Sequence, residues 1–509
     1  MGGHFQLNCI IENMDIPKEI QNISQKLADS GYKAYLVGGC TRDIFLGLKP
    51  NDWDIATDAR PEEIQGVFED AFYENEFGTV GVKSGSEDPT LKIVEITTFR
   101  KEGRYTDKRH PDEVVFSKSI EDDLARRDFT INAIAIDMVE SEDPIDPFGG
   151  RDDLKRKMIR AVGNASERFG EDALRLMRAV RLSAQLGFKI EEKTLEAVKK
   201  EAKSIKDIAL ERVRDEFSKL LMSQGATDGI RLLQETGLLK EIIPELSEGT
   251  GVEQNKHHIY DVFEHNVHSL EYAVGKDFSL DLRLASLLHD VGKVGTREWK
   301  NDPRGEKMKN GKSGDWTFYQ HQYLGEKLSR DILNRLKYPK EVVKRVALLV
   351  REHMFVYDPE MVTEKGVRRL IRRVGEENVD ALIKVREADR IGSGVPKAQP
   401  YRLRHLQAMI EKAKEEPVSV KQLKVDGNLL IKEMNMEPGP RMGQILAILL
   451  EEVIDDPKKN TKKYLIDKVK NLNVFSDKEL NDFSKKAKET VKDEQRRLDD
   501  AIKEKYFVK

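Results

Sequence analysis

The sequence predicts an α+β protein, in which a small mixed α/β head is followed by a mostly α-helical neck, body and tail. In residues 15–150, short apolar runs alternate with helix-like stretches, and β-branched residues concentrate in Ile93–Thr98 and Ile131–Asp137, as is typical of strands. From about residue 155 onward, apolar residues recur at spacings of three and four, the period of an amphipathic helix. These patterns divide the chain into four expected segments: 15–150, 151–250, 251–395 and 396–509.

Composition limits the classes of protein to consider. A length of 509 residues is enough for about three domains of ~150 residues with a buried core. Charged residues make up 35% of the chain, but the net charge is only −4, so any contact with RNA must come from local basic patches.

Cysteine content and hydropathy indicate the compartment. The two cysteines, Cys9 and Cys40, exclude a disulfide framework and a cysteine-based zinc site, and they fit a reducing compartment. The first residues lack a basic segment followed by an apolar run, so no signal peptide is expected. Ile445–Leu450 is an apolar run far shorter than the ~20 residues that span a bilayer. We therefore expect a cytoplasmic protein that does not bind membranes.

The segment Leu36–Asp43 contains a double glycine. Tyr35–Val37 is predicted to form a short strand, and Ile44–Leu48 the start of a helix. Gly38 and Gly39 then form the turn between them, where backbone can approach a phosphate closely.

Two carboxylates follow in Asn51–Thr57. Asp52 and Asp54 are two residues apart, so on a strand both side chains point to one face. Two acidic ligands on one face suit Mg²⁺, which keeps its remaining sites for water and substrate phosphates. Each motif alone is common in surface turns, but the two together at this spacing favour nucleotidyl transfer.

Further segments of the first third accompany these motifs. They are Glu95–Arg100 running into Glu102–Pro111, Arg126–Ala135, Asp146–Gly150 with Asp153 and Leu154, and Arg168–Ala179. Together with the glycine turn they resemble the class II template-independent nucleotidyltransferases, which comprise tRNA CCA-adding enzymes and bacterial poly(A) polymerases. Residues 425–450 look like the C-terminal part of bacterial CCA-adding enzymes, so the resemblance covers most of residues 30–460.

The resemblance implies that Asp52, Asp54 and Glu95 hold two Mg²⁺ ions at the catalytic centre. One ion would activate the attacking hydroxyl and the other would guide the triphosphate. Glu95 lies on an alternating strand, where the alternative is an outward-facing surface carboxylate.

Nucleotide contacts are expected around the same turn. The helix start, where N–H groups and the dipole favour phosphate, contains Gly38, Gly39, Arg42 and Asp43. Arg42 could instead pair structurally with Asp43 or Asp52. The resemblance adds three residues that would support the sugar and phosphates: Arg127, Asp128 and Asn132.

Base selection without a template needs protein groups that imitate a Watson–Crick partner. On a helix, Asp172, Arg175 and Arg178 step three at a time and lie close to one face. The carboxylate can accept from the exocyclic amine that C and A share, and an arginine can donate to the adjacent ring acceptor. An ordinary salt bridge on a solvated helix is the alternative, and Arg181 is expected to extend the basic face.

A His-Asp doublet lies downstream in Leu287–Lys293, with further histidines before and after it. Imidazoles and carboxylates are suitable ligands for Mn²⁺, Ni²⁺, Zn²⁺ or Mg²⁺. The pattern resembles the HD superfamily of metal-dependent phosphohydrolases. Its core ligands would be His265, His289, Asp290 and Asp389, and the residues for phosphate or a second metal would be His321 and His353. A purely structural metal site is the alternative.

The best candidate for RNA contacts is Lys365–Arg373. Its four arginines form two i,i+4 pairs that suit phosphate contacts, and they are Arg368, Arg369, Arg372 and Arg373. A solvated face paired with Glu364, Glu376 and Glu377 is equally compatible with the sequence.

The resemblance implies addition of C, C and A from CTP and ATP to the 3′ end of tRNA, with release of pyrophosphate. The loop Arg100–Pro111 resembles that of full CCA-adding members. The close alternatives are a poly(A) polymerase and an enzyme that adds only CC or only A. Alternatives of other classes are a phosphohydrolase that acts mainly through the HD site and a noncatalytic RNA-binding protein. The oligomeric state is left open.

Overall fold

The computed structural model describes residues 16–75, 78–102, 114–139, 143–255, 259–301, 314–414, 420 and 423–508. Two compact units are formed, Met1–His353 with Ala381–Pro396, and Met354–Asp380 with Lys397–Lys509. The chain therefore leaves the first unit after His353, returns at Ala381 and leaves again after Pro396. Most of the predicted loop Glu102–Pro111 lies outside the described residues.

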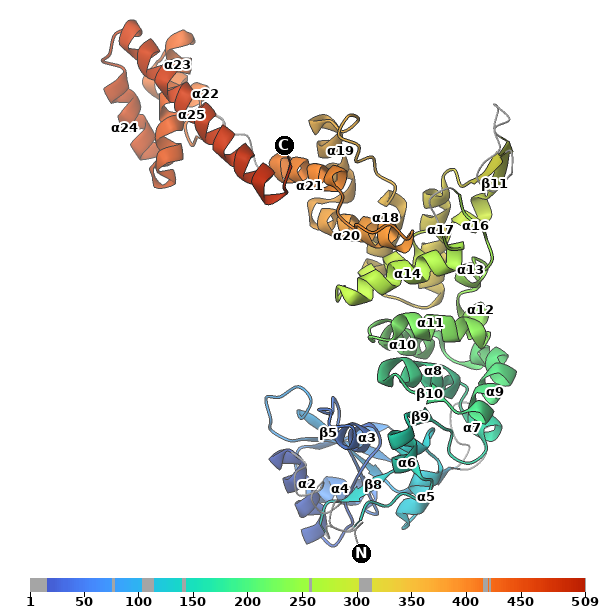
Figure 1. The fold of residues 1–509 in the computed structure, drawn as a ribbon. Helices are drawn as coiled ribbons and strands as arrows, with labels where there is room; N and C mark the ends of the chain where they lie inside the picture. The colour runs from blue at the N-terminus through green and yellow to red at the C-terminus, as the bar shows by residue number, and fades with distance from the viewer. Residues whose placement is uncertain are drawn as a thin grey trace, which may run out of the picture. The chain divides into compact units, whose positions relative to one another are not determined.

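The head is built on a six-stranded mixed sheet with the order β3-β4-β5-β2-β1-β8 (Figure 1). β2 runs parallel to β5, and the other neighbours are antiparallel. The strands are β1 (Tyr35–Val37), β2 (Asp54–Thr57), β3 (Ala71–Asn75), β4 (Thr79–Lys83), β5 (Ile93–Thr98) and β8 (Ala135–Asp137), with a separate pair β6 (Arg100–Glu102) and β7 (Val114–Phe116). The helical elements are α2 (Lys18–Asp29), α3 (Gly39–Phe45), α4 (Pro61–Val67), α5 (Ile120–Ala125), η1 (Thr130–Asn132) and α6 (Gly150–Arg156).

Alternation along the strands gives the sheet two apolar faces. Leu36 and Ile55 belong to a core that includes buried residues of α2 and α4. Tyr35 and Ala56 belong to the opposite core, which includes residues of α5. Because strand side chains alternate, Asp54, the first residue of β2, lies on the same face as Ala56.

The strands predicted at Tyr35–Val37 and Ile93–Thr98 are confirmed with the same bounds. The strand predicted over Ile131–Asp137 was too long, since only Ala135–Asp137 forms β8. Its first residues are taken up by the 3₁₀ turn η1, whose short hydrogen-bonded turn is incompatible with a β ladder.

Two other expectations in the head were wrong in position. A helix was expected to start at Ile44–Leu48, but α3 begins at Gly39. The chain turns at Gly38, whose φ of +81° favours glycine, and enters the helix at once. Asp52 was expected on a strand with Asp54, but β2 begins only at Asp54, so Asp52 lies in the turn before it.

The neck is helical, as predicted. Its elements are the short parallel pair β9 (Met158–Ile159) and β10 (Lys189–Ile190), and α7 (Ala165–Glu171), α8 (Leu174–Leu186), α9 (Glu192–Glu201), η2 (Ala202–Asp207), α10 (Leu210–Leu221), α11 (Ala226–Glu235), α12 (Leu238–Ile242) and α13 (Pro244–Ser247). α8 packs against both α10 and α11, and it buries Leu176, Met177 and Val180.

A second helical bundle follows in the same unit. It contains α14 (Val262–Gly275), α15 (Leu280–Leu288), α16 (Lys293–Thr296), the hairpin β11 (Glu298–Asn301) and β12 (Gly314–Thr317), α17 (His321–Arg335), α18 (Lys340–Glu352) and the later part of α20 (Glu376–Gly392). Arg283 of α15 is fully buried, and its guanidinium donates to the backbone oxygens of Leu221, Ser223 and Phe278. This arginine fastens the bundle to the C-terminal end of α10.

The second unit is helical in its described residues apart from turns and connecting segments. Its helices are α19 (Glu364–Val374), the start of α20, α21 (Tyr401–Lys414), α22 (Gly427–Met434), α23 (Pro440–Asp455), η4 (Pro457–Lys459), α24 (Lys462–Leu472) and α25 (Asp477–Lys505). Leu430, Leu449, Leu465 and Leu480 join α22 to α25 in one core. Among the described residues, no helix has the length and apolar character needed to cross a membrane.

Candidate functional sites

The glycine turn lies directly against the first two carboxylates. A Cβ atom at Gly38 would lie 2.8 Å from Oδ2 of Asp54, and one at Gly39 would lie 3.7 Å from Oδ1 of Asp52. The Gly38 position also faces the guanidinium of Arg127 at 3.1 Å. Glycine is therefore required at position 38 by both its φ angle and the proximity of a carboxylate.

Strand pairing brings the third carboxylate to the same place. In the parallel pair β2–β5, Asp54 is the register partner of Glu95, so the two side chains point to one face. Asp52 and Glu95 are exposed, whereas Asp54 is partly buried, and burial raises the pKa of Asp54 to about 6. Among the described residues, these three do not form a group whose ligand atoms all lie within 4.8 Å of one another. The head therefore presents an open set of carboxylates.

A chain of polar contacts links the glycine turn to the neck. Arg42 donates to Oδ1 of Asp43 at 2.8 and 2.7 Å, and to Oδ1 of Asn132 at 3.0 Å. The amide of Asn132 donates to Oδ1 of Asp128 at 3.1 Å, and Nε of Arg178 donates to Oδ2 of Asp128 at 2.7 Å. The pairing of Arg42 with Asp43, one of the alternatives considered from the sequence, is thus present.

Asp128 is the buried centre of this chain. Burial would raise the pKa of the Asp128 carboxyl, but the guanidiniums of Arg178 and Arg175 hold that pKa well below its usual range. Asp128 therefore stays ionised and holds Arg178 of α8 against the head.

The three residues expected to select the base do not share a helix. Asp172 lies in extended backbone between α7 and α8, so its predicted helical position was wrong. Its carboxylate accepts from Arg212 at 2.7 Å and from the backbone N–H of Leu174 at 3.0 Å. The bond to the backbone stabilises a break between α7 and α8, because a continuous helix would use that N–H for its own hydrogen bonds. Arg175 is 9% exposed and donates to Glu171 at 2.6 Å. The role of these residues in base selection stays a prediction.

Three residues that position this region were missed by the sequence analysis. Asp123 is fully buried and accepts from both Arg126 and Arg127. Arg212 and Glu216 lie four residues apart on α10. Arg212 forms an ion pair with Asp172, and Oε2 of Glu216 lies 2.5 Å from Nε of Arg181. The i,i+4 spacing of these two was the available signal, although it is common on solvated helices.

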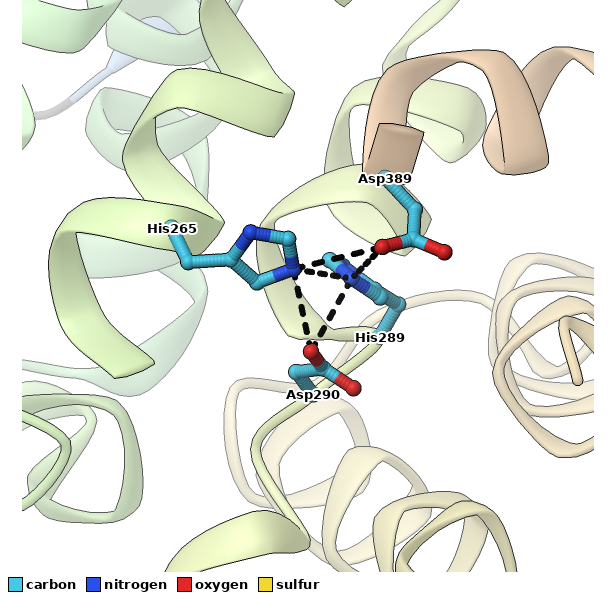
Figure 2. A group of neighbouring side chains, drawn as sticks. All are labelled: His265, His289, Asp290 and Asp389. Carbon is cyan, nitrogen blue, oxygen red and sulfur yellow. Dashed lines mark hydrogen bonds and ion pairs between the residues drawn. The ribbon is translucent and has the colours of Figure 1, made fainter. Parts of the chain in front are cut away.

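The histidines and aspartates of the helical bundle meet in one buried cluster, which we call the histidine cluster. Figure 2 shows His265 of α14, His289 and Asp290 after α15, and Asp389 of α20 pointing toward one another. Nε2 of His265 lies 3.0 Å from Nε2 of His289, 3.0 Å from Oδ2 of Asp290 and 3.4 Å from Oδ1 of Asp389.

The two remaining histidines form a second ligand group with Asp290. Nε2 of His321 lies 3.1 Å from Oδ1 of Asp290, and Nε2 of His353 lies 3.6 Å from the same oxygen. Since Oδ2 faces the first group, Asp290 lies between two sets of ligand atoms, each of which fits within 4.8 Å. All six predicted residues are therefore brought together, and each is less than a tenth exposed.

The hydrogen bonds of the imidazoles fit metal binding. Nδ1–H of His289, His321 and His353 donates to the carbonyl oxygens of Ser286, Phe318 and Val350 at 2.9, 2.8 and 2.6 Å. These bonds fix the tautomer in which Nε2 carries the lone pair, and they orient each ring toward the cluster centre. Several Nε2 atoms packed against carboxylates form a donor set suited to a divalent metal ion.

The pKa shifts of the histidines in the cluster also fit metal binding. Burial would lower the pKa of His289, but Asp290 and Asp389 raise it to about 10, whereas burial lowers the pKa of His353 to about 4. Lys293 places Nζ 2.5 Å from Oδ2 of Asp290. The metal-free cluster is thus held together by protons and an ammonium group, which divalent cations would displace.

The arginine-rich helix α19 belongs to the second unit. The four predicted arginines, Arg368, Arg369, Arg372 and Arg373, are all exposed. Arg368 lies 3.6 Å from Glu364, and Glu376 lies 3.7 Å from Lys414. This geometry does not test whether α19 contacts RNA, so the RNA contact stays a prediction.

Three families match the chain. Residues 34–160 match the Poly A polymerase head domain, and residues 187–249 match a family described as the probable RNA and SrmB-binding site of polymerase A. Residues 312–469 match a second domain of tRNA nucleotidyltransferases.

Several CCA-adding enzymes are similar to this chain, some over most of its length and others over about half of it. The CCA-adding enzyme of Lactococcus lactis is 33% identical over 88% of this chain and 96% of its own length. That of Leuconostoc citreum is 45% identical, over 44% of this chain and 55% of its own length. The structure of the Bacillus stearothermophilus CCA-adding enzyme in complex with CTP has a TM-score of 0.56 at 28% identity, covering 89% of this chain and 98% of that chain. A Thermotoga maritima CCA-adding enzyme complexed with tRNA shares the fold, with a TM-score of 0.51 at 19% identity over 92% and 98%.

Proposed function

The chain belongs to the CCA-adding enzymes, and from that membership we propose which of its residues carry out nucleotide addition. The enzyme is a nucleotidyltransferase that completes the 3′ end of tRNA with C, C and A from CTP and ATP. The observation that carries the assignment is the position of Gly38 against Asp54, with Glu95 in register beside it. A reaction on tRNA, together with the low content of two cysteines, fits a cytoplasmic location.

Asp52, Asp54 and Glu95 would hold divalent ions, and Mg²⁺ fits their all-oxygen donor set. Ions held by these carboxylates would supply charge neutralisation of the triphosphate and would lower the pKa of the attacking hydroxyl. The 3′-hydroxyl oxygen of tRNA forms a bond to the α-phosphorus, and the bond to the bridging oxygen breaks. The proton passes to solvent, and pyrophosphate leaves. Because Gly38 and Gly39 carry no side chain, the backbone of this turn would leave room for the triphosphate beside the carboxylates.

The polar chain from Arg42 to Arg178 would position the nucleotide. Arg42, with Asn132 and Asp128, connects the glycine turn to α8, which contains two of the predicted base-selecting residues, Arg175 and Arg178. Asp172 and Arg175 would have to exchange their present partners, Arg212 and Glu171, for the edge of cytosine or adenine. Their role therefore requires a rearrangement when the nucleotide binds.

The direct test uses a tRNA transcript that lacks CCA. Wild type and an Asp52→Ala/Asp54→Ala variant receive labelled CTP and ATP, together or singly, with Mg²⁺, and the products are sequenced. Wild type is expected to make a CCA end and the variant none. A poly(A) product, or addition limited to CC or to A, would contradict the proposed reaction.

We also propose that the histidine cluster hydrolyses phosphate esters. The sharing of Asp290 between two groups of Nε2 atoms carries this proposal, because two adjacent cation sites are an arrangement used for phosphoryl chemistry. In the hydrolysis, water oxygen forms a bond to phosphorus and the ester P–O bond breaks. One proton of the water remains on the phosphate product, and the other passes to the leaving alcohol. The metal would be Mn²⁺, Ni²⁺, Zn²⁺ or Mg²⁺.

Paired variants separate the two sites. His289→Ala is expected to abolish metal-dependent hydrolysis and leave CCA addition intact, while Asp52→Ala/Asp54→Ala has the opposite effect. If the wild-type protein binds metal but hydrolyses no phosphate ester, the hydrolase proposal is contradicted and the cluster is a structural metal site.

We further propose that α19 contacts tRNA phosphates through Arg369 and Arg372, which are exposed. Replacing both with alanine should weaken tRNA binding a few-fold at low salt and reduce the salt dependence of binding. An unchanged salt dependence would favour a solvated helix face.

A further inference from the structure

The C-terminal helix of the chain borders a cavity in the second unit. α21 packs against both α19 and α25 (Figure 1), and a cavity of about 720 Å³ lies among these three helices. Its volume is typical of sites that hold small organic ligands. All of its described lining residues belong to the second unit, whereas the head carboxylates and the histidine cluster belong to the first. The cavity is therefore separate from both proposed reactions.

The walls of the cavity are largely aliphatic. On α21, Ala408 and Met409 lie on the same helix face as His405, at spacings of three and four. On α25, Val491 and Ile502 lie about three turns apart and line the same cavity. The imidazole of His405 is the only aromatic ring among the described lining residues. Such walls suit an aliphatic ligand better than a nucleobase, which proteins commonly hold by stacking on aromatic rings.

The acids that line the cavity each lie beside a cation that also lines it. Glu364 lies 3.6 Å from Arg368, and Oδ2 of Asp499 lies 2.7 Å from Nζ of Lys412. The acids are therefore offset by these two cations, and any further cation in the lining leaves an excess of positive charge.

Two further cations line the cavity on α25. Lys492 and Lys503 are exposed, and neither has an ion-pair partner among the described residues. His405 adds a polar group, since its Nδ1 is buried and makes no hydrogen bond within the described part of the chain. The cavity thus combines an aliphatic wall with two lysines that are free to pair with an anion.

We propose that this cavity binds a free aliphatic carboxylate, such as a fatty acid. The hydrocarbon chain would lie against the aliphatic side chains, where burial of apolar surface favours binding. The carboxylate would pair with Lys492 or Lys503 in a charge-assisted hydrogen bond. A nucleotide would match the lysines equally well, but its base would have no aromatic ring to stack on apart from His405.

Calorimetric titration of the full chain with decanoate, below the concentration at which it forms micelles, tests the proposal, and decanol is the neutral probe of equal chain length. Wild type is expected to bind one decanoate. Ala413→Trp, which places a ring in the cavity, should abolish binding of both probes. Lys492→Glu/Lys503→Glu should weaken decanoate binding about tenfold or more and leave decanol binding unchanged. The matched control is Lys485→Glu/Lys488→Glu, two exposed lysines of α25 that are not among the lining residues.

The proposal is overturned if wild type binds no decanoate, if Ala413→Trp binds it as tightly as wild type, or if the two double lysine variants weaken it equally. Retained CCA addition shows that each variant is folded, and the lysine variants alter only exposed positions. ATP and vesicles of phosphatidylglycerol are tested beside decanoate. If either binds in its place, and Lys492→Glu/Lys503→Glu alone weakens that binding, a nucleotide or a lipid surface replaces the free carboxylate and the proposal fails.

Discussion

Two of the three carboxylates of the head are exposed to solvent, whereas the ligands of the histidine cluster are all buried and oriented. Asp52 and Glu95 are exposed, and their oxygens do not gather with Asp54 into a compact ligand group. In the cluster, Asp290 and His289 are almost inaccessible, and three imidazoles are fixed by backbone carbonyls. The two centres therefore differ in how much of a cation site exists before a cation arrives.

This difference has a chemical reason. A site that transfers nucleotides receives its ions with the triphosphate, whose oxygens complete the coordination, so two or three carboxylates on an open face are sufficient. Imidazole ligands must be supplied by the protein in full, and each needs a second hydrogen bond to fix its tautomer. We therefore expect the cluster to bind metal without substrate and the head to bind metal strongly only with nucleotide.

The largest expected effect would come from Asp52→Asn. Loss of one of so few carboxylates should reduce CCA addition about 1,000-fold or more, while metal uptake by the histidine cluster stays unchanged. Incorporation of labelled CTP into tRNA lacking CCA measures the first effect, and metal analysis measures the second. Glu62→Gln, an exposed acid on α4, is the matched control. Activity of Asp52→Asn within tenfold of wild type would refute the assignment.

Asp290→Asn tests the cluster in the same way. Because Asp290 belongs to both ligand groups, this variant should lose both bound ions, with affinity reduced about 100-fold or more, whereas His321→Ala should keep one. Equilibrium dialysis with Mn²⁺ counts the ions, and CCA addition should remain within about twofold of wild type. The control is Asp331→Asn, an exposed acid on α17. Two ions still bound to Asp290→Asn would show that Asp290 does not connect the groups.

A smaller effect is expected where the head meets the neck. Arg178 contacts Oδ2 of Asp128 through both Nε and Nη2, and a lysine cannot reproduce this fork. Arg178→Lys should therefore lower kcat/KM for both CTP and ATP about tenfold. Arg181→Lys, on the same helix but bound to Glu216, serves as the comparison. Equal effects of the two variants would mean that the link to Asp128 is not what matters.

The smallest effect concerns stability. Folding raises the pKa of Asp54 from 3.8 to about 6, so the folded, metal-free protein retains a proton that the unfolded chain releases. Stability without metal should therefore fall as pH rises through this window, and Asp54→Asn should stabilise the protein at pH 7 by about 1 kcal/mol. Denaturant unfolding in EDTA at pH 4 and pH 7 measures this. Asp54→Asn that is no more stable than wild type at pH 7 would contradict the expected penalty.

The histidine cluster could be predicted almost completely from the sequence. His289 and Asp290 stand in an apolar helical stretch, and the six residues named from this pattern do meet in space, although their binding of metal stays a prediction. The shared position of Asp290 could not be predicted, because it depends on how α17, α18 and α20 pack around the doublet.

The head was harder to predict at its boundaries. Spacing placed Asp52 and Asp54 on one strand and Asp172 within a helix. In the structure, β2 begins only at Asp54, and α7 ends at Glu171, one residue before Asp172. Glu216 and Arg212 were missed because their significance lies in partners 35 and 40 residues away in the sequence. Sequence periodicity gives the faces of helices, but it does not show which polar groups are buried when those helices pack.

The path of the chain through the histidine cluster has a consequence for how the molecule holds together. His353 is the last residue before the chain leaves the first unit, and Asp389 lies in the segment that returns to it. Both reach the cluster, so ions bound on either side of Asp290 would close the intervening segment into a loop, as a covalent cross-link does. A disulfide that closes about 40 residues lowers the entropy of the unfolded chain by an equivalent of about 4 kcal/mol. Metal supply would thereby regulate the resistance of this part of the chain to unfolding and proteolysis, quite apart from any reaction at the cluster.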